Sequence, residues 1–593
     1  MSANESRPTA NRAANEEISD VPAGDTTEFT SSEASTEAEV ERVFDDSNSA
    51  TSVALNPTPL NELIRAATEF YLDGIDPAKP PTPAQIEAEL LGKVNRSITV
   101  ANKSRGKRDQ LATLKTLTHS QVADILLHRH RIVLITSDLD SDSDGDSLRI
   151  YVREGRDEGI YSADLKLFRV LIKQLNYSAD TRFIEETLKA LRDRADRVLA
   201  NEDQDTIAVA NGIFDFKTKT LCPFTPDVIF TSKLTTRYVA TATNPVITMS
   251  DGSTWDVETW IASLSDDPEV VDLLWEIISA VVRPRVSWNK CVFFYSEKGN
   301  NGKGTLCSLM TNLVGSTYCP SIPLNAFSKE FHLERLLSAT AIVTHENDVG
   351  FYVDQGANFK AVVTHDTIAV NRKHKAVIDH TFWGMMIQCV NAMPSTRDKS
   401  RSWYRRQLWV PFFKDFTHGE RTEIKDDFLA RQEVLEYVLH RALHMEHYSL
   451  SQPQACRDLL LEVQENNDNV LEFLMSFKDQ WVWDLVPYPF LYDLYVAWMA
   501  QAHKGTTPTP TLKFTKEVRR HVGEQDLTCH VDGQELTWRD SGGQVRPSGK
   551  MDKPELLIAK YDLTNWCNPG YPGKDPALRS RPMLADKYYG LVR

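Results

Sequence analysis

Short apolar runs in the middle of the chain alternate with helical patterns. The stretch 290–314, KCVFFYSEKGNNGKGTLCSLMTNLV, reads as a strand, a glycine-rich loop and an amphipathic helix. Two further apolar runs, at 339–344 and 384–390, each end in polar residues. Strands that alternate with helices are typical of a parallel sheet with helices on its faces. The pattern therefore predicts an α/β core.

The regions on both sides of this core show other patterns. Residues 58–130 and 160–200 have helical spacing, whereas 205–240 reads as short strands joined by turns. Two helices are expected within 422–478, and 488–525 shows a helix, turn, helix pattern with a polar, glycine-rich stretch after it. That order is typical of a winged-helix-like unit.

The 593 residues are enough for about three or four domains. The formal net charge is −16, and 12 acidic against 3 basic residues stand in 1–56. This balance argues against a protein that coats nucleic acid through bulk positive charge, so DNA binding requires local basic patches. The predicted parts are a disordered acidic tail (1–56), a helical N-terminal region (57–130), an α+β domain (131–250), the α/β core (251–415) and a C-terminal helical and winged-helix-like domain (416–593).

The eight cysteines are widely scattered and include no C-x-x-C pair. This spacing argues against a structural zinc site and favours a reduced, cytoplasmic protein. Cys291, Cys307 and Cys389 lie in apolar segments and are expected to be buried. No apolar run approaches the ~20 residues that a membrane span needs, so we expect a soluble protein.

The glycine-rich loop has the chemistry of a nucleoside triphosphate site. Small residues let backbone N–H groups surround phosphate oxygens, a lysine reaches the β- and γ-phosphates, and the helix N-terminus favours an anion. The loop departs from G-x-x-x-x-G-K-[ST] at two positions: Glu297 stands in place of the first glycine, and Gly304 stands in place of the serine or threonine. Thr305, one residue later, is expected to supply the missing hydroxyl. A solvated turn is the alternative. The predicted binding residues are Gly299, Asn300, Asn301, Gly302, Lys303, Gly304 and Thr305.

Carboxylates follow the apolar run 339–344, in the sequence His345-Glu346-Asn347-Asp348. A parallel strand that ends in a carboxylate beside a phosphate loop is how a P-loop ATPase holds Mg²⁺ and orients the attacking water. Glu346 is the first candidate for this role and Asp348 the second. Ordinary polar residues that close a strand are the alternative interpretation.

Asn391 follows the run 384–390, where its amide can hydrogen-bond a γ-phosphate. The pair Arg405-Arg406 stands just before the strand LWVPF. An arginine in that place can reach the γ-phosphate of a neighbouring subunit and neutralise charge in the transition state. Hydrolysis would then depend on assembly of an oligomer.

The order of these residues carries a family resemblance. Lys303, Glu346, Asn391 and the arginine pair fall within about a hundred residues, and this order resembles a superfamily 3 helicase. More closely, the chain resembles the phage, plasmid and poxvirus-type primase-helicase family. The segments that carry this resemblance are DTIAVANGIFDFKTKTLCPFTPD, EKGNNGKGT, QCVNAMPSTRDKSRSWYRRQLWVPF, ENNDNVLEFL and LYDLYVAWM.

The resemblance implies an AAA+-like P-loop ATPase with ATP and Mg²⁺ as cofactors, preceded by a pre-helicase domain. It also implies a ring, usually a hexamer, that moves 3′ to 5′ on single-stranded DNA during replication of a phage, plasmid or integrated element in a bacterial host cell. By position it assigns triphosphate and metal binding to Lys303 and Thr305, water activation and metal binding to Glu346 and Asp348, γ-phosphate sensing to Asn391, and a role in trans to Arg405 or Arg406.

A basic segment lies between the second and third strands. Within IAVNRKHKAVID, which reads as a hairpin, the turn carries Arg372, Lys373, His374 and Lys375. A charge run like this is most often a solvated turn. The resemblance instead implies that Lys373 and His374 lie on a hairpin that grips DNA in the pore of the ring.

Two other functions remain open. Asp138 and Asp140, between the strand-like runs RIVLIT and LRIYV, are candidate metal-binding carboxylates of a primase. The C-terminal helix, turn, helix segment could instead serve an origin-binding initiator or loader. Its candidate DNA contacts are Lys513, Lys516, Arg519 and Arg520.

Overall fold

The computed structural model describes residues 59–593 except 138, 140–145, 330, 349–351, 354–355, 374–376, 397, 418–420, 526 and 532. The predicted acidic tail, 1–56, therefore lies outside the described residues. Residues 63–593 form one compact unit. Within the described residues, no helix combines the length and the apolar character that a membrane crossing requires.

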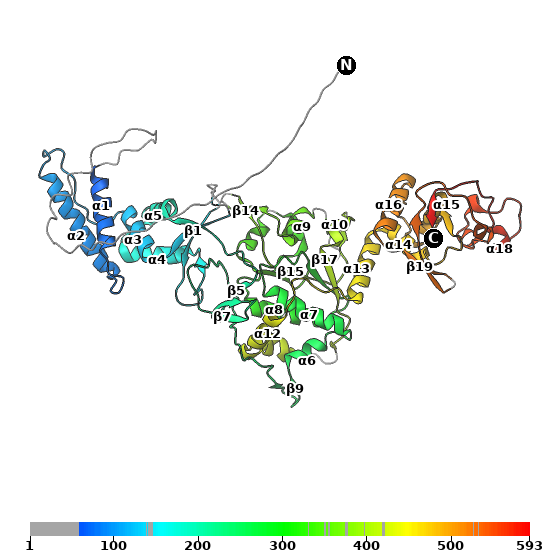
Figure 1. The fold of residues 1–593 in the computed structure, drawn as a ribbon, viewed down its shortest axis with the longest axis horizontal. Helices are drawn as coiled ribbons and strands as arrows, with labels where there is room; N and C mark the ends of the chain where they lie inside the picture. Colours follow the sequence, from blue (N-terminus) through cyan, green and yellow to red (C-terminus); the bar gives the residue numbers. More distant parts are fainter. Residues whose placement is uncertain are drawn as a thin grey trace, which may run out of the picture. The chain divides into compact units, whose positions relative to one another are not determined.

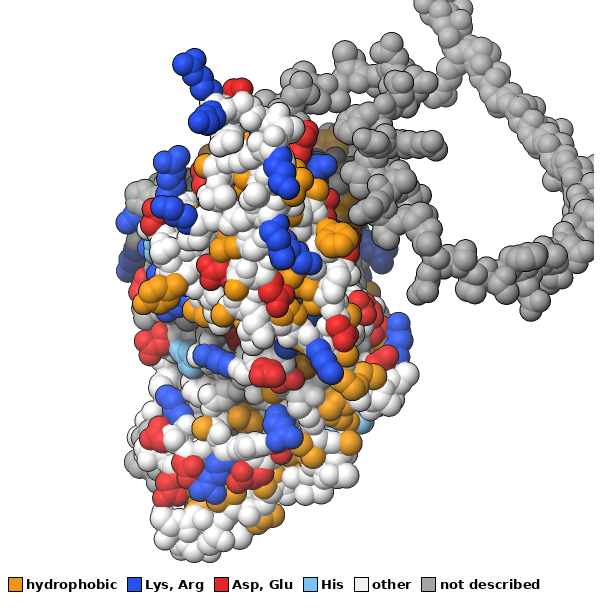
Figure 2. Space-filling view, turned by 90° about the vertical axis from the view of Figure 1, so that its left-hand side faces the viewer, with side chains coloured by type: hydrophobic (Ala, Val, Ile, Leu, Met, Phe, Trp, Pro, Cys, Tyr) orange, Lys and Arg blue, Asp and Glu red, His pale blue; other side chains and the backbone are white. Residues whose placement is uncertain are grey.

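Three helices open the described part of the chain (Figure 1): α1 (Pro59–Asp73), α2 (Pro83–Asn102) and α3 (His119–Arg129). Thr82 and Thr118 start α2 and α3 with the same capping box, in which the threonine hydroxyl and a glutamine three residues later satisfy each other's backbone N–H groups. The helical prediction for this region is confirmed. On the side of the molecule drawn in Figure 2, lysine and arginine side chains are interspersed with acidic ones.

A mixed sheet follows, in the order β3-β2-β1-β4. Its strands are β1 (Ile132–Thr136), β2 (Ser147–Tyr151), β3 (Tyr161–Ser162) and β4 (Asp196–Leu199), and its helices are α4 (Leu165–Leu175) and α5 (Thr181–Arg194). The expectation of helix throughout 160–200 is wrong at both ends, because β3 pairs with β2 and β4 runs parallel to β1. Both strands are too short to show a local period, so only pairing with distant residues defines them.

The predicted short strands of 205–240 are confirmed in the first half, as an antiparallel sheet of β5 (Thr206–Val209), β6 (Gly212–Asp215) and β7 (Thr220–Cys222). The prediction is wrong for residues 223–240, all of them described, which form turns and irregular structure. A small hairpin, β8 (Ile247–Thr248) with β9 (Thr254–Trp255), comes next. The helices α6 (Val257–Ala262) and α7 (Pro268–Val281) lead into the core.

The core sheet is parallel, in the order β11-β15-β10-β17. Its strands are β10 (Cys291–Tyr295), β11 (Ala341–Thr344), β15 (Met385–Val390) and β17 (Gln407–Pro411), and every residue in them is buried. Strands covered on both faces read as continuous apolar runs, which is why the sequence pattern located them. The predicted parallel sheet is confirmed.

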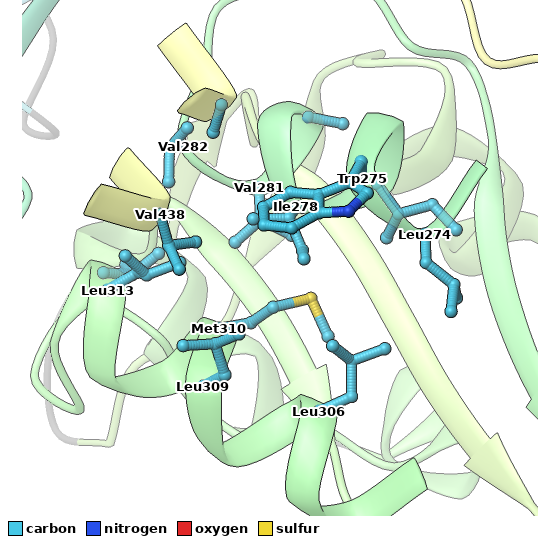
Figure 3. Close-up of a cluster of buried hydrophobic side chains, with 14 of the residues drawn as sticks. Leu274, Trp275, Ile278, Val281, Val282, Leu306, Leu309, Met310, Leu313 and Val438 are labelled. Atoms are coloured by element: carbon cyan, nitrogen blue, oxygen red, sulfur yellow. The ribbon is translucent and has the colours of Figure 1, made fainter. Parts of the chain in front are cut away.

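Alternate residues of β10 point into two different cores. Val292 and Phe294 pack with α7, α8 (Lys303–Val314) and α12 (Gln432–His444). Phe293 and Tyr295 pack on the other face, with α9 (Ala357–Val363) and α13 (Gln454–Asn467). Figure 3 shows part of the first core, where side chains of α7 such as Trp275 lie against Met310 of α8. This packing fixes the start of α8 at the edge of the sheet.

Smaller elements connect the core strands. They are the 3-10 helices η1 (Leu324–Ser328), η2 (His332–Ser338) and η4 (Phe428–Ala430), the strand pairs β12 (Tyr352–Val353) with β16 (Ser395–Thr396) and β13 (Ile368–Val370) with β14 (Ile378–His380), and the helices α10 (Arg401–Tyr404) and α11 (Thr422–Asp426).

The C-terminal region packs around a separate cluster of buried tryptophan, phenylalanine and aliphatic side chains. The predicted helix, turn, helix pattern is confirmed, and an antiparallel hairpin of β19 and β20 follows it. The elements are α14 (Asn469–Phe477), β18 (Leu485–Pro487), α15 (Tyr488–Ala502), α16 (Thr511–Glu524), β19 (Thr528–Val531), β20 (Gln534–Thr537), β21 (Arg539–Asp540), η5 (Gly549–Asp552), α17 (Leu557–Lys560), η6 (Thr564–Trp566), α18 (Pro576–Arg579) and β22 (Gly590–Val592).

Candidate nucleotide site at the edge of the parallel sheet

The loop between β10 and α8 has a tightly determined backbone. Gly302, the N-cap of α8, has φ 85° and ψ −9°, and a Cβ there would lie 2.5 Å from Cδ2 of buried Leu264. Asn301 is buried, its Nδ2 donates to the Lys298 carbonyl (2.5 Å), and its Oδ1 accepts from the Lys303 backbone N–H (3.3 Å). These contacts hold the N-terminus of α8 at the C-terminal edge of the sheet.

The space along this loop is open where an anion would approach the helix. A Cβ built on Gly299 or on Gly304 would meet no atom within 4 Å. The first N–H groups of a helix have no carbonyl partner within the helix, so they can bind an anion there. In α8 the N–H of Lys303 donates to Asn301 Oδ1, and those of Gly304 and Thr305 follow it. Asn300, with φ 53°, also lies in the left-handed region, which asparagine tolerates better than most residues.

Lys303 is buried, with 6% of its surface exposed. Its Nζ donates to Asn391 Oδ1 (2.8 Å) and to the carbonyl oxygens of Ser296 (3.1 Å) and Val390 (3.3 Å). An ammonium has three protons, so these contacts can use all its donors. Burial lowers the pKa of Lys303 from its ordinary value. The structure thus brings together the lysine and the asparagine that two separate sequence patterns predicted.

Glu297 occupies the position at which the usual motif has its first glycine. Its Oε1 accepts a hydrogen bond from the Tyr295 hydroxyl (3.1 Å), while the residue itself is exposed. Both residues line an open cavity of about 450 Å³, together with Asn391 and with Glu462 and Asn466 of α13. The departure at Glu297 therefore places a carboxylate at the rim of a cavity beside the loop.

The residues after β11 differ in their exposure. Glu346 and Asp348 are exposed, and Asp348 accepts a hydrogen bond from Asn325 Nδ2 (2.8 Å). Asn347 between them faces inward: its Nδ2 donates to Gln388 Oε1 (3.0 Å) and to the Cys389 carbonyl (3.0 Å). The two candidate carboxylates thus project from a turn that Asn347 anchors to β15.

The pairing of Asn347 with Gln388 was not predicted from the sequence. Gln388 is fully buried, and its Nε2 donates to the Ile322 carbonyl (3.1 Å). A glutamine inside the apolar run MMIQCV was the available signal, since a buried amide requires hydrogen-bond partners. Thr305, the predicted metal-binding hydroxyl, is half-buried in the first turn of α8.

The two candidate arginines before β17 differ in their surroundings. Arg406 Nη1 donates to the carbonyl (2.5 Å) and to the hydroxyl (2.7 Å) of Ser402 in α10. Burial and the neighbouring charge of Arg405 lower the pKa of Arg406. Arg405 is exposed. Arg406 is therefore folded back onto its own chain, whereas Arg405 faces the surface.

The predicted basic hairpin is confirmed as an antiparallel pair, β13 with β14, in which Ile368 lies opposite His380. Lys373 is exposed and Arg372 is half-buried at its turn. His374 and Lys375 lie outside the described residues. So do Asp138 and Asp140, the candidate primase carboxylates.

The basic residues of α16 separate into two groups. Lys513 and Lys516 are exposed. Arg519 lies 3.5 Å from an Asp540 carboxylate oxygen, and Arg520 lies 3.1 Å from that of Asp468. Of the four candidate DNA contacts on this helix, two are thus engaged in ion pairs within the chain.

Three family models match separate parts of the chain. Residues 145–266 match a model described as D5 N terminal like, 294–406 match a family of unknown function (DUF5906), and 465–542 match a model described as poxvirus D5 protein-like. No curated protein matches the chain at a significant level.

Solved structures similar to the chain include two of the NrS-1 C terminal region. The A form apo structure is 11% identical, with a TM-score of 0.41 over 71% of this chain and 99% of the other. The apo structure of residues 305–718 is 10% identical, with the same TM-score and the same coverage. The two D5-like matches lie before and after the strands of the parallel sheet in the sequence. They support a relationship to the D5-type primase-helicases of viruses and phages, and with it a role in DNA replication.

Proposed function

We propose that this protein is an ATP-dependent DNA helicase of the superfamily 3 type that acts in replication of a phage, plasmid or integrated element. The observation that carries the proposal is the contact of Lys303 with Asn391 at the C-terminal edge of a parallel sheet, beside an open helix N-terminus. A lysine and an amide at that edge are groups that can bind a γ-phosphate.

The residues of the loop fit a triphosphate. Backbone N–H groups from Gly299 to Thr305 would face the phosphate oxygens, and Gly302 permits the sharp turn that aims them. Lys303 would exchange its two carbonyl contacts for phosphate oxygens, since a charged acceptor is the stronger partner for an ammonium. Asn391 would then hold Lys303 and sense the γ-phosphate.

The donor set beside the loop fits Mg²⁺, which prefers oxygen ligands. The half-buried Thr305 hydroxyl and the exposed carboxylates of Glu346 and Asp348 would supply protein oxygens. When bound, the metal neutralises phosphate charge. Glu346 would also orient the attacking water and accept its proton, for which an exposed carboxylate anchored through its neighbour Asn347 is suited.

Arg405 is the arginine that we assign to the neighbouring subunit's site. Its side chain is exposed, whereas Arg406 donates to Ser402 within its own subunit. A guanidinium that arrives from outside can neutralise the charge that develops in the transition state. This assignment requires an oligomer, and we propose a hexameric ring, as in the family that the chain resembles, with Arg372, Lys373, His374 and Lys375 facing single-stranded DNA.

The parallel order β11-β15-β10-β17, with the phosphate loop on a central strand, favours an AAA+-like core. The helices α15 and α16 and the hairpin of β19 and β20 favour a winged-helix-like unit at the C-terminus. The exposed Lys513 and Lys516 of α16 favour a second, compatible function, in which this unit binds duplex DNA at an origin.

The test is ATP hydrolysis by the purified full chain with and without single-stranded DNA. We expect stimulation by DNA, and loss of hydrolysis in Lys303→Ala. Lys329→Ala, which removes an exposed lysine after η1, is the matched control and should behave as the wild type. Hydrolysis that persists in Lys303→Ala would refute the site, and a wild-type protein without any DNA-stimulated hydrolysis would refute the function.

A further inference from the structure

The segment 394–406, which ends in the arginine pair, is fastened at its beginning by the last residue of α13. Asn467 Oδ1 accepts from the backbone N–H of Thr396 (2.9 Å), and its Nδ2 donates to the Pro394 carbonyl (3.2 Å). One side chain thus binds the segment through both a donor and an acceptor. The end of α13 is therefore tied to the start of the segment.

Asp468, the next residue, is the buried centre of an ionic cluster. Its side chain is 5% exposed, and its Oδ2 lies 3.1 Å from both His521 Nε2 and Arg520 Nη2 of α16. Lys399 Nζ, from the arginine segment, lies 3.8 Å from Oδ1. Burial alone would raise the pKa of Asp468, but the contacts with His521 and the charge of Lys399 lower it to about 2. The carboxylate is therefore the shared anion between α16 and the arginine segment.

Arg520 also holds the backbone of the segment. Its Nη1 donates to the Lys399 carbonyl (2.8 Å), six residues before Arg405 in the sequence. Tyr404 is buried, and in the described part of the chain its hydroxyl has no hydrogen-bond partner. Burial strongly raises the pKa of Tyr404, so this hydroxyl stays protonated. Hydrogen bonds around Ser400 and Arg401 form the short helix α10, and Arg520 ties the start of this turn to α16.

A cavity of about 200 Å³ adjoins this cluster. Its lining includes Lys399, Tyr404, Arg405, Asp468, Arg520 and His521. The arginine and the ionic cluster therefore line the same cavity.

We propose that Asp468 is a positioning residue that places Arg405 for its role in the neighbouring subunit, and that α16 thereby controls hydrolysis through Arg520 and Lys399. The inference rests on the proposed function, because Arg405 acts in trans only in an assembled ATPase. It predicts that a subunit without the Asp468 charge fails to supply Arg405 to its neighbour, so hydrolysis falls in the neighbour's site. The nucleotide site of the altered subunit itself stays intact.

Asp468→Asn removes the negative charge of the side chain and keeps its size. Asp468 is also the N-cap of α14, where its Oδ1 accepts from the Val470 N–H (3.1 Å), and asparagine caps helices about as well as aspartate. We expect kcat for ATP to fall about tenfold or more, with KM changed less than twofold. Asp552→Asn, an exposed aspartate of the same region, is the matched control and should keep wild-type kcat. Arg520→Met should reproduce the defect. Because this side chain is 26% exposed, the variant is the substitute if Asp468→Asn folds poorly.

The decisive experiment mixes variants in equal amounts with single-stranded DNA and measures hydrolysis. Lys303→Ala subunits carry a well-placed Arg405, so their mixture with Asp468→Asn should recover several-fold in activity. Arg405→Ala subunits lack the arginine, so their mixture with Asp468→Asn should stay at the level of the variants alone. Recovery with both partners, or with neither, would overturn the positioning role. A reference mixture of Lys303→Ala with Arg405→Ala must itself recover, and its failure would count against the arginine in trans and thus against the proposed function.

Discussion

The Nζ of Lys303 lies 2.8 Å from Oδ1 of Asn391, a residue 88 positions later in the chain. The contact joins the first residue of α8 to the residue that follows β15. Because β15 and β10 are neighbours in the sheet, their C-terminal ends deliver the asparagine and the phosphate loop to the same edge. The candidate site therefore depends on sheet order as much as on the loop.

Asn391→Ala should lower kcat for ATP by about 10²-fold with a much smaller change in KM. The reason is that an amide aimed at developing charge contributes about this factor in other hydrolytic sites. Hydrolysis is measured across ATP concentrations, with Asn565→Ala, an exposed asparagine of the C-terminal region, as the control. An unchanged kcat would remove Asn391 from the site.

Gly302→Ala should destabilise the protein by about 1–2 kcal/mol, the cost of a left-handed backbone for a residue with a Cβ. The added methyl would also press on Leu264. Gly304→Ala is the matched control: it lies in α8 with open space beside it, so its stability should not fall. Thermal unfolding of both variants checks the difference, and equal melting temperatures would contradict the strained turn.

Gln388→Leu should destabilise the protein by about 1–3 kcal/mol, because one Nδ2 proton of Asn347 would be left without its buried partner. The Ile322 carbonyl would lose the contact with Gln388 and keep the one with the Thr344 hydroxyl. The comparison is Gln480→Leu, at an exposed position, which should change stability little. The measurement is denaturant unfolding. A Gln388→Leu protein as stable as the wild type would show that the pairing contributes nothing to the fold.

Stability should depend on pH through Glu555, which is 1% exposed and whose pKa burial raises to about 7. The unfolded carboxyl titrates near 4.5, so the folded state binds more protons between these values. The contribution, roughly 3 kcal/mol at most, is complete below pH 4.5 and is lost as pH rises through 7.

Glu555→Gln should therefore flatten the fall of melting temperature between about pH 5 and 7 relative to the wild type. Glu535→Gln, on an exposed strand residue, is the control and should keep the wild-type profile. Parallel profiles for wild type and Glu555→Gln would show that this carboxyl does not carry the pH dependence.

Lys373→Ala should weaken binding of single-stranded DNA and reduce the dependence of log K on log salt concentration by about 0.7 for each phosphate that the lysine neutralises. The exposed position of Lys373 at the turn of the β13 and β14 hairpin is the basis for this expectation. Fluorescence anisotropy at several salt concentrations measures it, with Lys329→Ala as the comparison. An unaltered slope would place DNA elsewhere.

The sequence pattern located the strands of the core sheet because strands buried on both faces are apolar at every position. It failed at β4, where four residues with little burial become a strand only by pairing with β1. It selected Glu346 and Asp348 but not Asn347, because a turn residue does not reveal by its type which side chains face inward.

Residue type and spacing were enough to define the nature of the candidate site: a glycine-rich loop with one lysine, carboxylates and an amide after apolar runs, and an arginine pair before the last strand. All of these are local features of the chain. The three-dimensional arrangement was needed to show that Lys303 contacts Asn391, that Arg406 folds back while Arg405 is exposed, and that Asp468 joins α16 to the arginine segment. Such contacts join residues far apart in the chain, and sheet order and helix packing, which no local pattern encodes, bring them together.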